Sequence, residues 1–415
     1  MKKIFTLLFF FLLGTFLMAQ GKKVATGKVT TGDDLLLTKY FDLIKGKNIG
    51  LVTNHTGLLS DGRHIADALH ENKDVKLIAL FGPEHGVRGD TTGAVENAVD
   101  KKTGVPVYSL YGKTYKPTPE MLKGVEVLLF DIQDVGARFY TYISTLGHVL
   151  EAAAENNIPV IVLDRPNPIT GIHVDGFVTD DTLHSFVAFG KIPVQHGLTV
   201  GELAELYNGE GMLEGGKKAK LTVIKMEGWK RNMWYDQTGL KWVKTSPNLP
   251  VLETAEVYPG TCFFEGVNAT EGRGTQRPFQ YIGAPWADGN KIQKLLKNKN
   301  IKGADFKAVE FTPEFLPNNA RPPKYNGQQC KGVYLSVKDR NSFMPVQAGV
   351  YLLWAFKQTN PESMKWRVRT IDRLAGTPRL REMIDEGKTP EDIIKSWQKE
   401  LTDFKKVRSK YLLYK

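Results

Sequence analysis

VKLIALFGPEHG, residues 75–86, joins a short apolar run to a tight turn that carries two ionisable side chains. The apolar run has the length and composition of a buried β-strand. Glycine and proline surround Glu84 and His85 immediately after it. A buried carboxylate without partners is energetically costly, so we expect Glu84 to be either paired or used in chemistry.

Similar apolar runs recur on both sides of this stretch and alternate with helical patterns. The helical patterns are GRHIADALHEN, residues 140–156 and TVGELAELYN, where Thr199 and Glu202 form a capping box. Apolar strands that alternate with helices are typical of a parallel sheet covered on both faces. We therefore predict an α/β fold, with a Rossmann-like N-terminal catalytic domain over residues 21–245. The other expected strands are KNIGLVTN, VPVYSLYG, VEVLLFDI, IPVIVLDR and LTVIKMEG.

The composition changes after residue 245. Residues 246–286 are rich in glycine, proline and aromatic residues and show little helical periodicity. Regular patterns then return, with a strand expected at GVYLSVKD and helices at QAGVYLLWAFKQ and TPEDIIKSWQKEL. We predict a smaller α+β C-terminal domain, residues 246–415, that completes an active-site cleft.

The first residues of the chain are typical of a secretory signal peptide. Lys2 and Lys3 precede an almost entirely apolar run, and Ala19 supplies a small residue at a plausible cleavage point. We predict a signal peptide at residues 1–19 and a protein exported to the periplasm or secreted. The alternative is an N-terminal membrane anchor, but the run is short for a span of about 20 residues. No later segment is apolar enough for stable membrane insertion.

Net charge and cysteine content say little about which molecules the protein binds. The formal net charge of +11 suits anionic wall polymers and sugars, and an exported basic protein need not bind nucleic acid. Cys262 and Cys330 are the only cysteines, and a disulfide between them and two free thiols both stay open. We interpret His64, Asp67 and His70 as a solvent-exposed helix face, and we expect no metal site.

Polar side chains follow four of the expected strands. In a parallel sheet these positions share one edge, where ligands bind. A structural role is the alternative to ligand binding, because Asp131 could cap a helix and Asp164 could stabilise a turn. The four sets are Asn54 and His55; Glu84, His85 and Arg88; Asp131 and Arg138; and Asp164 and Arg165.

A second polar cluster lies in ATEGRGTQRPF, which contains Glu271 and Arg273 among glycines. Glycine lets backbone approach a ligand closely. The dinucleotide-binding pattern, the Walker A pattern and the G-x-S-x-G pattern are absent from the sequence. We therefore expect no nucleotide or other cofactor and no common serine-hydrolase layout.

The chain resembles one family along almost all of its length. LVTNHTG, FGPEHGVRG, DIQDVGARFYTYISTL, LDRPNP, SPNLP and EGRGTQRPF are similar to motifs of the exo-β-N-acetylmuramidases of the NamZ type, long known only as a domain of unknown function. The resemblance implies a cleft between two domains and release of N-acetylmuramic acid from the non-reducing ends of peptidoglycan fragments. It also implies that Glu84 is the favoured catalytic residue.

The expected chemistry is glycosidic bond cleavage with Glu84 as proton donor and later base. Glu271, Asp131 and Asp164 are alternatives for a second catalytic group, and the substrate's own acetamido group is a further one. An arginine should bind the lactyl carboxylate of N-acetylmuramic acid. The arginine candidates are Arg88, Arg138, Arg165 and Arg273, and Asn54, His55, His85, Asp164 and His196 are further substrate-binding candidates.

Rival functions stay open at this point. Two lobes and a polar cleft also suit a non-catalytic periplasmic binding protein for muropeptides. An N-acetylglucosaminidase, or an esterase or amidase that acts on modified wall sugars, would share the expected compartment. Product analysis separates these classes, because a binding protein leaves its ligand intact.

Overall fold

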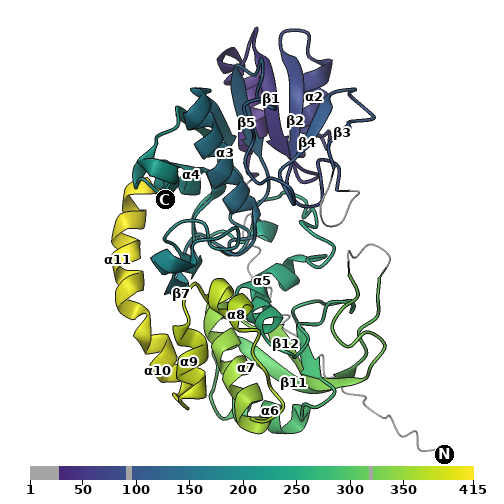
Figure 1. Ribbon diagram of the computed structural model, residues 1–415, viewed down its shortest axis with the longest axis vertical. Coiled ribbons are helices and arrows are strands. Elements are labelled where there is room, and N and C mark those ends of the chain that lie inside the picture. The colour runs from purple at the N-terminus through teal and green to yellow at the C-terminus, as the bar shows by residue number, and fades with distance from the viewer. Residues whose placement is uncertain (1–27, 90–95, 317–320) are drawn as a thin grey trace, which may run out of the picture.

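The computed structural model describes residues 28–89, 96–316 and 321–415. The signal peptide predicted for residues 1–19 lies outside the described residues. Figure 1 shows two lobes, with the N-terminal strands at the top and the C-terminal helices at the bottom. No described helix is long and apolar enough to cross a membrane.

The upper lobe is built around a seven-stranded sheet in the order β3-β4-β2-β1-β5-β6-β9. All neighbouring pairs are parallel except β3 with β4. Without the short strand β3, this is the doubly wound order of a Rossmann fold. The predicted fold class and all six predicted strands of this domain are confirmed. The strands are β1 Asn48–Thr53, β2 Lys76–Gly82, β3 Ala98–Val99, β4 Pro106–Ser109, β5 Val127–Asp131, β6 Val160–Leu163 and β9 Leu221–Ile224.

Helices cover both faces of this sheet. Apolar residues of α1 (Gly32–Thr38) and α2 (Ile65–Glu71) pack in one core with alternate strand residues such as Ile49 and Leu51. Residues of α3 (Tyr142–Asn156) and α4 (Val200–Gly209) pack on the other face, in the larger core that contains Val52. The capping box predicted for Thr199 and Glu202 is present at the start of α4.

The lower lobe combines helices with a three-stranded antiparallel sheet in the order β10-β12-β11. A two-stranded hairpin, β7 with β8, packs against α7 and α11. The predicted strand at GVYLSVKD and the predicted helices at QAGVYLLWAFKQ and TPEDIIKSWQKEL are confirmed. The elements are β7 Asp175–Val178, β8 Pro193–Gln195, β10 Tyr281–Ala284, β11 Ala304–Phe311, β12 Cys330–Val337, α5 Leu252–Thr261, α6 Gly289–Lys297, α7 Pro345–Thr359, α8 Val368–Ala375, α9 Arg379–Asp385, α10 Pro390–Ser396 and α11 Gln398–Arg408.

Helix α5 is an element that the sequence did not indicate. It lies in the glycine- and proline-rich stretch, and its residues from Thr254 to Thr261 are all buried. A helix buried on all sides has no apolar stripe, and Pro259 within it further obscures the pattern. A side chain at Gly260 would meet the backbone of α7, so this glycine permits a close crossing of the two helices.

The end of the chain returns to the upper lobe. Helix α11 runs along the edge of the molecule and carries the C-terminus to α4 (Figure 1). Tyr414 then donates a hydrogen bond to Asp164 at the end of β6. Cys262 and Cys330 are both buried and free, so they form no disulfide here.

Candidate active site

The turn after β2 presents Glu84 at the carboxyl end of the sheet. The amide of Gly86 donates a hydrogen bond to the Pro83 carbonyl at 3.0 Å and closes the turn. His85 and Gly86 both have positive φ, 74° and 72°. A non-glycine residue with positive φ is uncommon and often lies at a functional site. The glycine and proline around Glu84 are therefore the residues that this sharp turn requires.

Glu84 lines a pocket of about 230 Å³ that both lobes build. The upper lobe contributes the Glu84 turn, Tyr111 and the segment before α3. The lower lobe contributes α5, the residues just after it and the end of α8. The lining residues are Glu84, His85, Tyr111, Phe139, Tyr140, Thr141, Tyr142, Val187, Ser246, Asn248, Tyr258, Cys262, Glu265, Arg273 and Leu374.

The surroundings of Glu84 favour its protonated form. Burial raises the pKa of Glu84 above its ordinary value, and the charge of Glu265 adds to the effect. A hydrogen bond from the Tyr111 hydroxyl opposes the shift, as do the charges of Arg273 and Arg321, but the net direction is upward. A carboxyl group with a raised pKa is suited to donate a proton near neutral pH.

Glu265 brings a second carboxylate into the same pocket. Its carboxylate accepts a hydrogen bond from the Arg273 guanidinium at 2.6 Å. Arg273 also lies 3.1 Å from Glu271 and has its guanidinium over the ring of Phe279. These contacts leave the Arg273 side chain partly exposed at the pocket wall. The pocket therefore contains two carboxylates and one guanidinium.

Glu271 lies behind Arg273 and does not line the pocket. Its buried carboxylate is 2.9 Å from the Lys324 ammonium and 3.1 Å from Arg273. Burial alone would raise the pKa of Glu271, but Lys324 and Arg273 outweigh burial and hold it below its ordinary value. This geometry gives Glu271 the role of positioning Arg273 and does not support its expected role as the second catalytic group.

Aromatic rings make up a large part of the pocket lining. The ring of Tyr140 packs edge to face against Tyr142 and Tyr258, with centroids 4.8 and 5.8 Å apart. Tyr258 also contacts Phe139 at 5.3 Å. The Tyr142 hydroxyl donates a hydrogen bond to the Thr245 carbonyl at 2.8 Å, which joins the segment between the lobes to α3. Such rings exclude water and offer apolar faces to a bound ligand.

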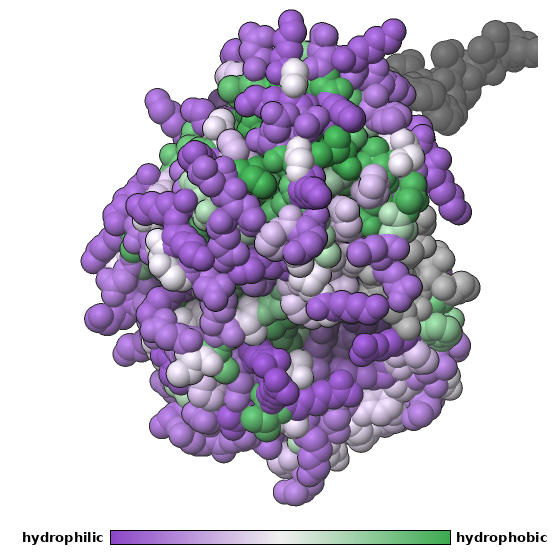
Figure 2. Space-filling view, turned by 45° about the horizontal axis from the view of Figure 1, so that its top comes forward, coloured by the Kyte–Doolittle hydropathy of each residue, from purple (hydrophilic) through white to green (hydrophobic). Residues whose placement is uncertain are grey.

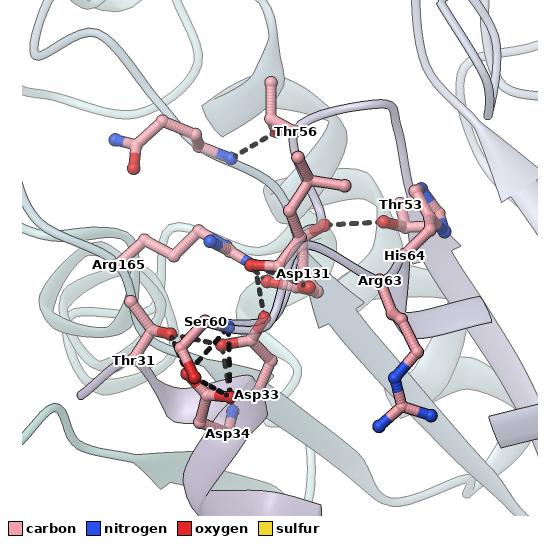
Figure 3. A network of polar contacts seen from close by, with 12 residues as sticks. Thr31, Asp33, Asp34, Thr53, Thr56, Ser60, Arg63, His64, Asp131 and Arg165 are labelled. Carbon is pink, nitrogen blue, oxygen red and sulfur yellow. Dashed lines mark hydrogen bonds and ion pairs between the residues drawn. The ribbon is translucent and has the colours of Figure 1, made fainter. Parts of the chain in front are cut away.

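Asp131 and Arg165 face each other at the carboxyl ends of the central strands. Arg165 donates to both carboxylate oxygens of Asp131, at 2.5 and 2.9 Å, and to Asp33 at 2.6 Å (Figure 3). Thr31 in turn donates to Asp33. All three charged side chains are nearly inaccessible to solvent. This network lies at the carboxyl ends of β1 and β5, where the strand order reverses and where many α/β proteins bind ligands.

The network bears on two residues that the sequence offered for the site, Asp131 and Arg165. Neither Asp131 nor Arg165 lines the Glu84 pocket, and each already has a buried partner of opposite charge. Asp131 is therefore not placed to be the second catalytic group, and Arg165 is not placed to bind the substrate carboxylate. Both hold the loops after β1, β5 and β6 together.

Two other arginines are also engaged inside the protein. Arg88 donates to Asp100 at 2.7 and 2.9 Å and to Asp67 at 2.8 Å. Arg138 is fully buried and donates to the carbonyls of Phe177, Ile192 and Leu374. Neither lines the pocket, so their expected contact with substrate is not supported. Asp67 is buried rather than part of an exposed helix face, which corrects that interpretation too.

Asp164 and His196 have structural contacts as well. Asp164 accepts hydrogen bonds from Thr199, from the Gly201 amide and from Tyr414. His196 accepts from the Leu198 amide at 3.1 Å, and its other ring nitrogen lies 3.6 Å from Asp134. Both side chains are fully buried and outside the pocket lining. They shape the loops at this end of the sheet.

Asn54 and His55 lie after β1, close to the pocket but not in its lining. The Asn54 side chain accepts from the amide and hydroxyl of Thr56, at 2.9 and 2.6 Å. The His55 ring lies 2.8 Å from the Lys244 carbonyl oxygen. Burial lowers the pKa of His55, and the neighbouring His85 lowers it further. Among the expected substrate-binding residues, the structure brings only His85 and Arg273 together with Glu84.

Tyr111 and Glu265 line the pocket, although neither was among the site residues predicted from the sequence. Tyr111 lies two residues beyond the end of β4, at the same edge of the sheet as Glu84, and this position was the available signal. Glu265 directly follows the apolar run CFF, and a single acidic residue at the end of such a run was the available signal for it. Among the described residues, no group of three histidine, cysteine, aspartate or glutamate side chains could hold a metal ion.

The fold and the pocket together define a class of protein. It is a two-lobed α/β protein with a Rossmann-like sheet and a pocket that holds a protonatable glutamate beside a second carboxylate. Models of the N- and C-terminal parts of the exo-β-N-acetylmuramidase NamZ match residues 49–253 and 256–414. The chain belongs to this family, as the sequence motifs indicated. The domain boundary expected at residue 245 stays a prediction.

Individual relatives agree with this membership. The chain is 48% identical over 390 residues to the peptidoglycan β-N-acetylmuramidase NamZ of Bacillus subtilis (strain 168), covering 93% of this chain and 92% of that protein. Two solved structures of DUF1343 family proteins from Bacteroides fragilis are also similar. They have TM-scores of 0.87 and 0.77 and identities of 40% and 35%, and each alignment covers 94% of this chain and 99% of the other.

Proposed function

We propose that this protein is an exo-acting glycosidase that releases N-acetylmuramic acid from the non-reducing end of peptidoglycan fragments. The observation that carries the proposal is the pocket in which Glu84, with its raised pKa, lies beside Glu265 and Arg273. The name of the Bacillus subtilis relative supports the reaction and the polymer. Turnover of the cell wall is the process in which such an enzyme would act.

Glu84 supplies the proton for the departing sugar. Cleavage of a glycosidic bond requires protonation of the leaving oxygen, because an alkoxide is a poor leaving group. Burial holds the Glu84 carboxyl in its protonated form to a higher pH than in water. After the bond breaks, the Glu84 carboxylate can accept a proton from the attacking water.

Glu265 is the second carboxylate of the reaction in this proposal. It is the one other acidic side chain among the residues that line the pocket. Its negative charge can stabilise the positive charge that develops at the anomeric carbon. It can do so by attacking that carbon or by holding the substrate's acetamido group for the same attack. Its ion pair with Arg273 keeps it in place.

Arg273 is the cation that we propose for the lactyl carboxylate. It is the one of the four expected arginines that lines the pocket, and its side chain remains partly exposed. Arginine binds carboxylates through two parallel hydrogen bonds, which gives both orientation and affinity. A sugar without the lactyl group would leave this guanidinium without its ligand.

The test compares two disaccharides that differ only in the lactyl group. Purified protein is incubated with β-1,4-linked N-acetylmuramic acid–N-acetylglucosamine and with the dimer of N-acetylglucosamine, and products are identified by mass spectrometry. We expect release of free N-acetylmuramic acid from the first and little cleavage of the second. Equal cleavage of both would indicate an N-acetylglucosaminidase, and binding without cleavage would indicate a binding protein.

We further propose that the protein acts outside the cytoplasm, after cleavage of residues 1–19. The basic start, the apolar run and Ala19 support this proposal. Expression of the full-length chain followed by N-terminal sequencing of the exported form tests it. A mature chain that begins near residue 20 in the periplasm or medium is expected. An uncleaved chain in the cytoplasm would contradict it.

A further inference from the structure

A cluster of aromatic rings extends from the Glu84 pocket toward solvent. Tyr111, which donates a hydrogen bond to Glu84, has its ring 6.1 Å from Tyr115 and 6.0 Å from Phe186. Tyr115 and Phe186 stack on each other with centroids 4.0 Å apart. The residue after Phe186, Val187, lines the pocket. The cluster is therefore continuous with the active site.

Tyr115, the outermost ring of this cluster, is exposed to solvent although it packs against two neighbouring rings. Tyr115 is 38% exposed, whereas Tyr111 and Phe186 are only partly buried. Phe186 lies parallel to the His148 ring on α3, at 6.0 Å, and His148 is 2.9 Å from the Glu151 carboxylate. A group of packed aromatic rings that is open to solvent beside a pocket is typical of a ligand-binding surface.

The position of the cluster indicates which part of a substrate would reach it. Glu84 must lie beside the oxygen that it protonates, and that oxygen belongs to the departing sugar. Tyr111 donates a hydrogen bond to Glu84, and its ring contacts Tyr115 and Phe186. A departing sugar on the Tyr111 side of Glu84 would therefore lie against these rings, whereas Arg273 and Glu265 line the pocket from the lower lobe.

Sugars and aromatic rings have complementary surfaces. In the chair form of N-acetylglucosamine the axial C–H bonds of C3 and C5 project from one face, and these weakly positive hydrogens fit the negative face of an aromatic ring. No cation in the described part of the chain is recorded over the ring of Tyr115 or Phe186, although Lys39 covers the ring of Tyr40 elsewhere. Phe186 stacks on one face of the Tyr115 ring, and the exposed remainder of that ring can meet an apolar sugar face.

We propose that Tyr115, supported by Phe186, forms the binding subsite for the sugar that departs when the glycosidic bond breaks. This inference rests on the proposed function, because it assigns a place to the leaving group of that reaction. It adds a determinant of specificity for the part of the substrate beyond the cleaved bond. A fragment with a sugar in that position should bind more tightly than one without it.

The experiment compares two substrates of N-acetylmuramic acid that differ only in the leaving group. One is the β-1,4-linked disaccharide with N-acetylglucosamine, and the other is the β-glycosyl fluoride, whose leaving group is a single atom. Tyr115→Ala should lower kcat/KM for the disaccharide by roughly tenfold, chiefly through KM, and leave the fluoride unchanged. Tyr115→Phe, which keeps the aromatic ring, should retain the wild-type kcat/KM for the disaccharide. Tyr40→Ala, which removes a ring that is 37% exposed outside the pocket lining, is the matched control.

Each outcome has a distinct meaning. Equal losses of kcat/KM on both substrates, or no loss on either, would overturn the subsite. Failure of the wild-type protein to release N-acetylmuramic acid from either substrate would instead overturn the proposed function. If Tyr115→Ala does not fold, Phe186→Leu provides the second test, because it removes the ring that supports Tyr115 and keeps the Tyr115 side chain itself. It should raise KM for the disaccharide alone, and an unchanged KM would count against the proposal.

Discussion

The Glu84 carboxyl illustrates how a few neighbours prepare a single residue for proton transfer. Burial raises its pKa, Glu265 adds to this effect, and Tyr111 and Arg273 moderate it. The sequence singled out Glu84 because it follows a strand in a tight turn, and the structure places it in the lining of a pocket. Its partners Tyr111 and Glu265 come from distant segments, and their approach depends on how the two lobes pack.

The Tyr111 hydroxyl should control the pH range of activity. Its hydrogen bond favours the ionised form of Glu84, so Tyr111→Phe should raise the pKa of Glu84 further. The acid must be protonated to act, and the alkaline limb of the profile of kcat/KM against pH should therefore move to higher pH. Tyr115→Phe is the control. An unchanged limb, or one that moves to lower pH, would contradict the assigned hydrogen bond.

Glu265 should be nearly as important as Glu84. Glu265→Gln removes the second negative charge of the pocket and should lower kcat by about 100-fold or more. It should also move the alkaline limb to lower pH, because the charge of Glu265 raises the pKa of Glu84. Glu253→Gln, a change at an exposed carboxylate in α5, is the matched control. A kcat that stays near the wild-type value, in a protein with unchanged Tm, would remove Glu265 from the mechanism.

At the scale of elements, the strands of the parallel sheet could be predicted from the sequence, whereas helix α5 could not. Buried parallel strands are short apolar runs, and these stand out against the helices between them. Helix α5 is buried on every side, so its apolar residues do not recur with helical spacing. It also contains Pro259 and Gly260, which are unusual inside a helix. This element supplies Tyr258 to the pocket and leads directly to Glu265, which explains why that part of the site escaped prediction.

The crossing of α5 and α7 should depend on glycine. A methyl group at Gly260 would come within 1.8 Å of the Pro345 carbonyl oxygen, and one at Gly349 within 2.4 Å of the Gly260 carbonyl oxygen. Gly260→Ala should therefore reduce the free energy of unfolding by about 2–3 kcal/mol, measured by chemical denaturation. Gly211→Ala is the comparison, since its positive φ makes alanine costly by about 1 kcal/mol while the surrounding space is open, so its loss should be smaller. Equal losses in the two variants would show that steric contact is not the cause.

At the scale of the whole molecule, the C-terminus ties the two lobes together. Besides Tyr414 with Asp164, the Arg408 guanidinium donates to the carbonyls of Gly171 and Gly197, and the Arg231 amide donates to the carbonyl of Lys415. The tail itself, FKKVRSKYLLYK, is rich in basic residues. These contacts are long-range, and no local pattern in the tail could reveal its partner.

The buried Asp164 should make stability depend on pH. Burial raises its pKa to about 7, so the folded state binds a proton that the unfolded state releases near pH 4. Stability contributed by this group is fully present below pH 4 and is lost as pH rises to about 7, by at most about 1.4 kcal/mol per pH unit. Asp164→Asn should flatten the free energy of unfolding across this range. An unchanged slope would show that Asp164 is not the group responsible.

The most direct test of the account is the release of N-acetylmuramic acid by Glu84→Gln, measured beside the wild-type protein. The wild type should release this sugar from its β-1,4-linked disaccharide with N-acetylglucosamine. Glu84→Gln should lose about 100-fold or more of that rate while binding the disaccharide with nearly unchanged Kd. Glu71→Gln, at an exposed carboxylate of the same lobe, should behave like the wild type. Substantial release by folded Glu84→Gln would contradict the assignment of Glu84 as the acid.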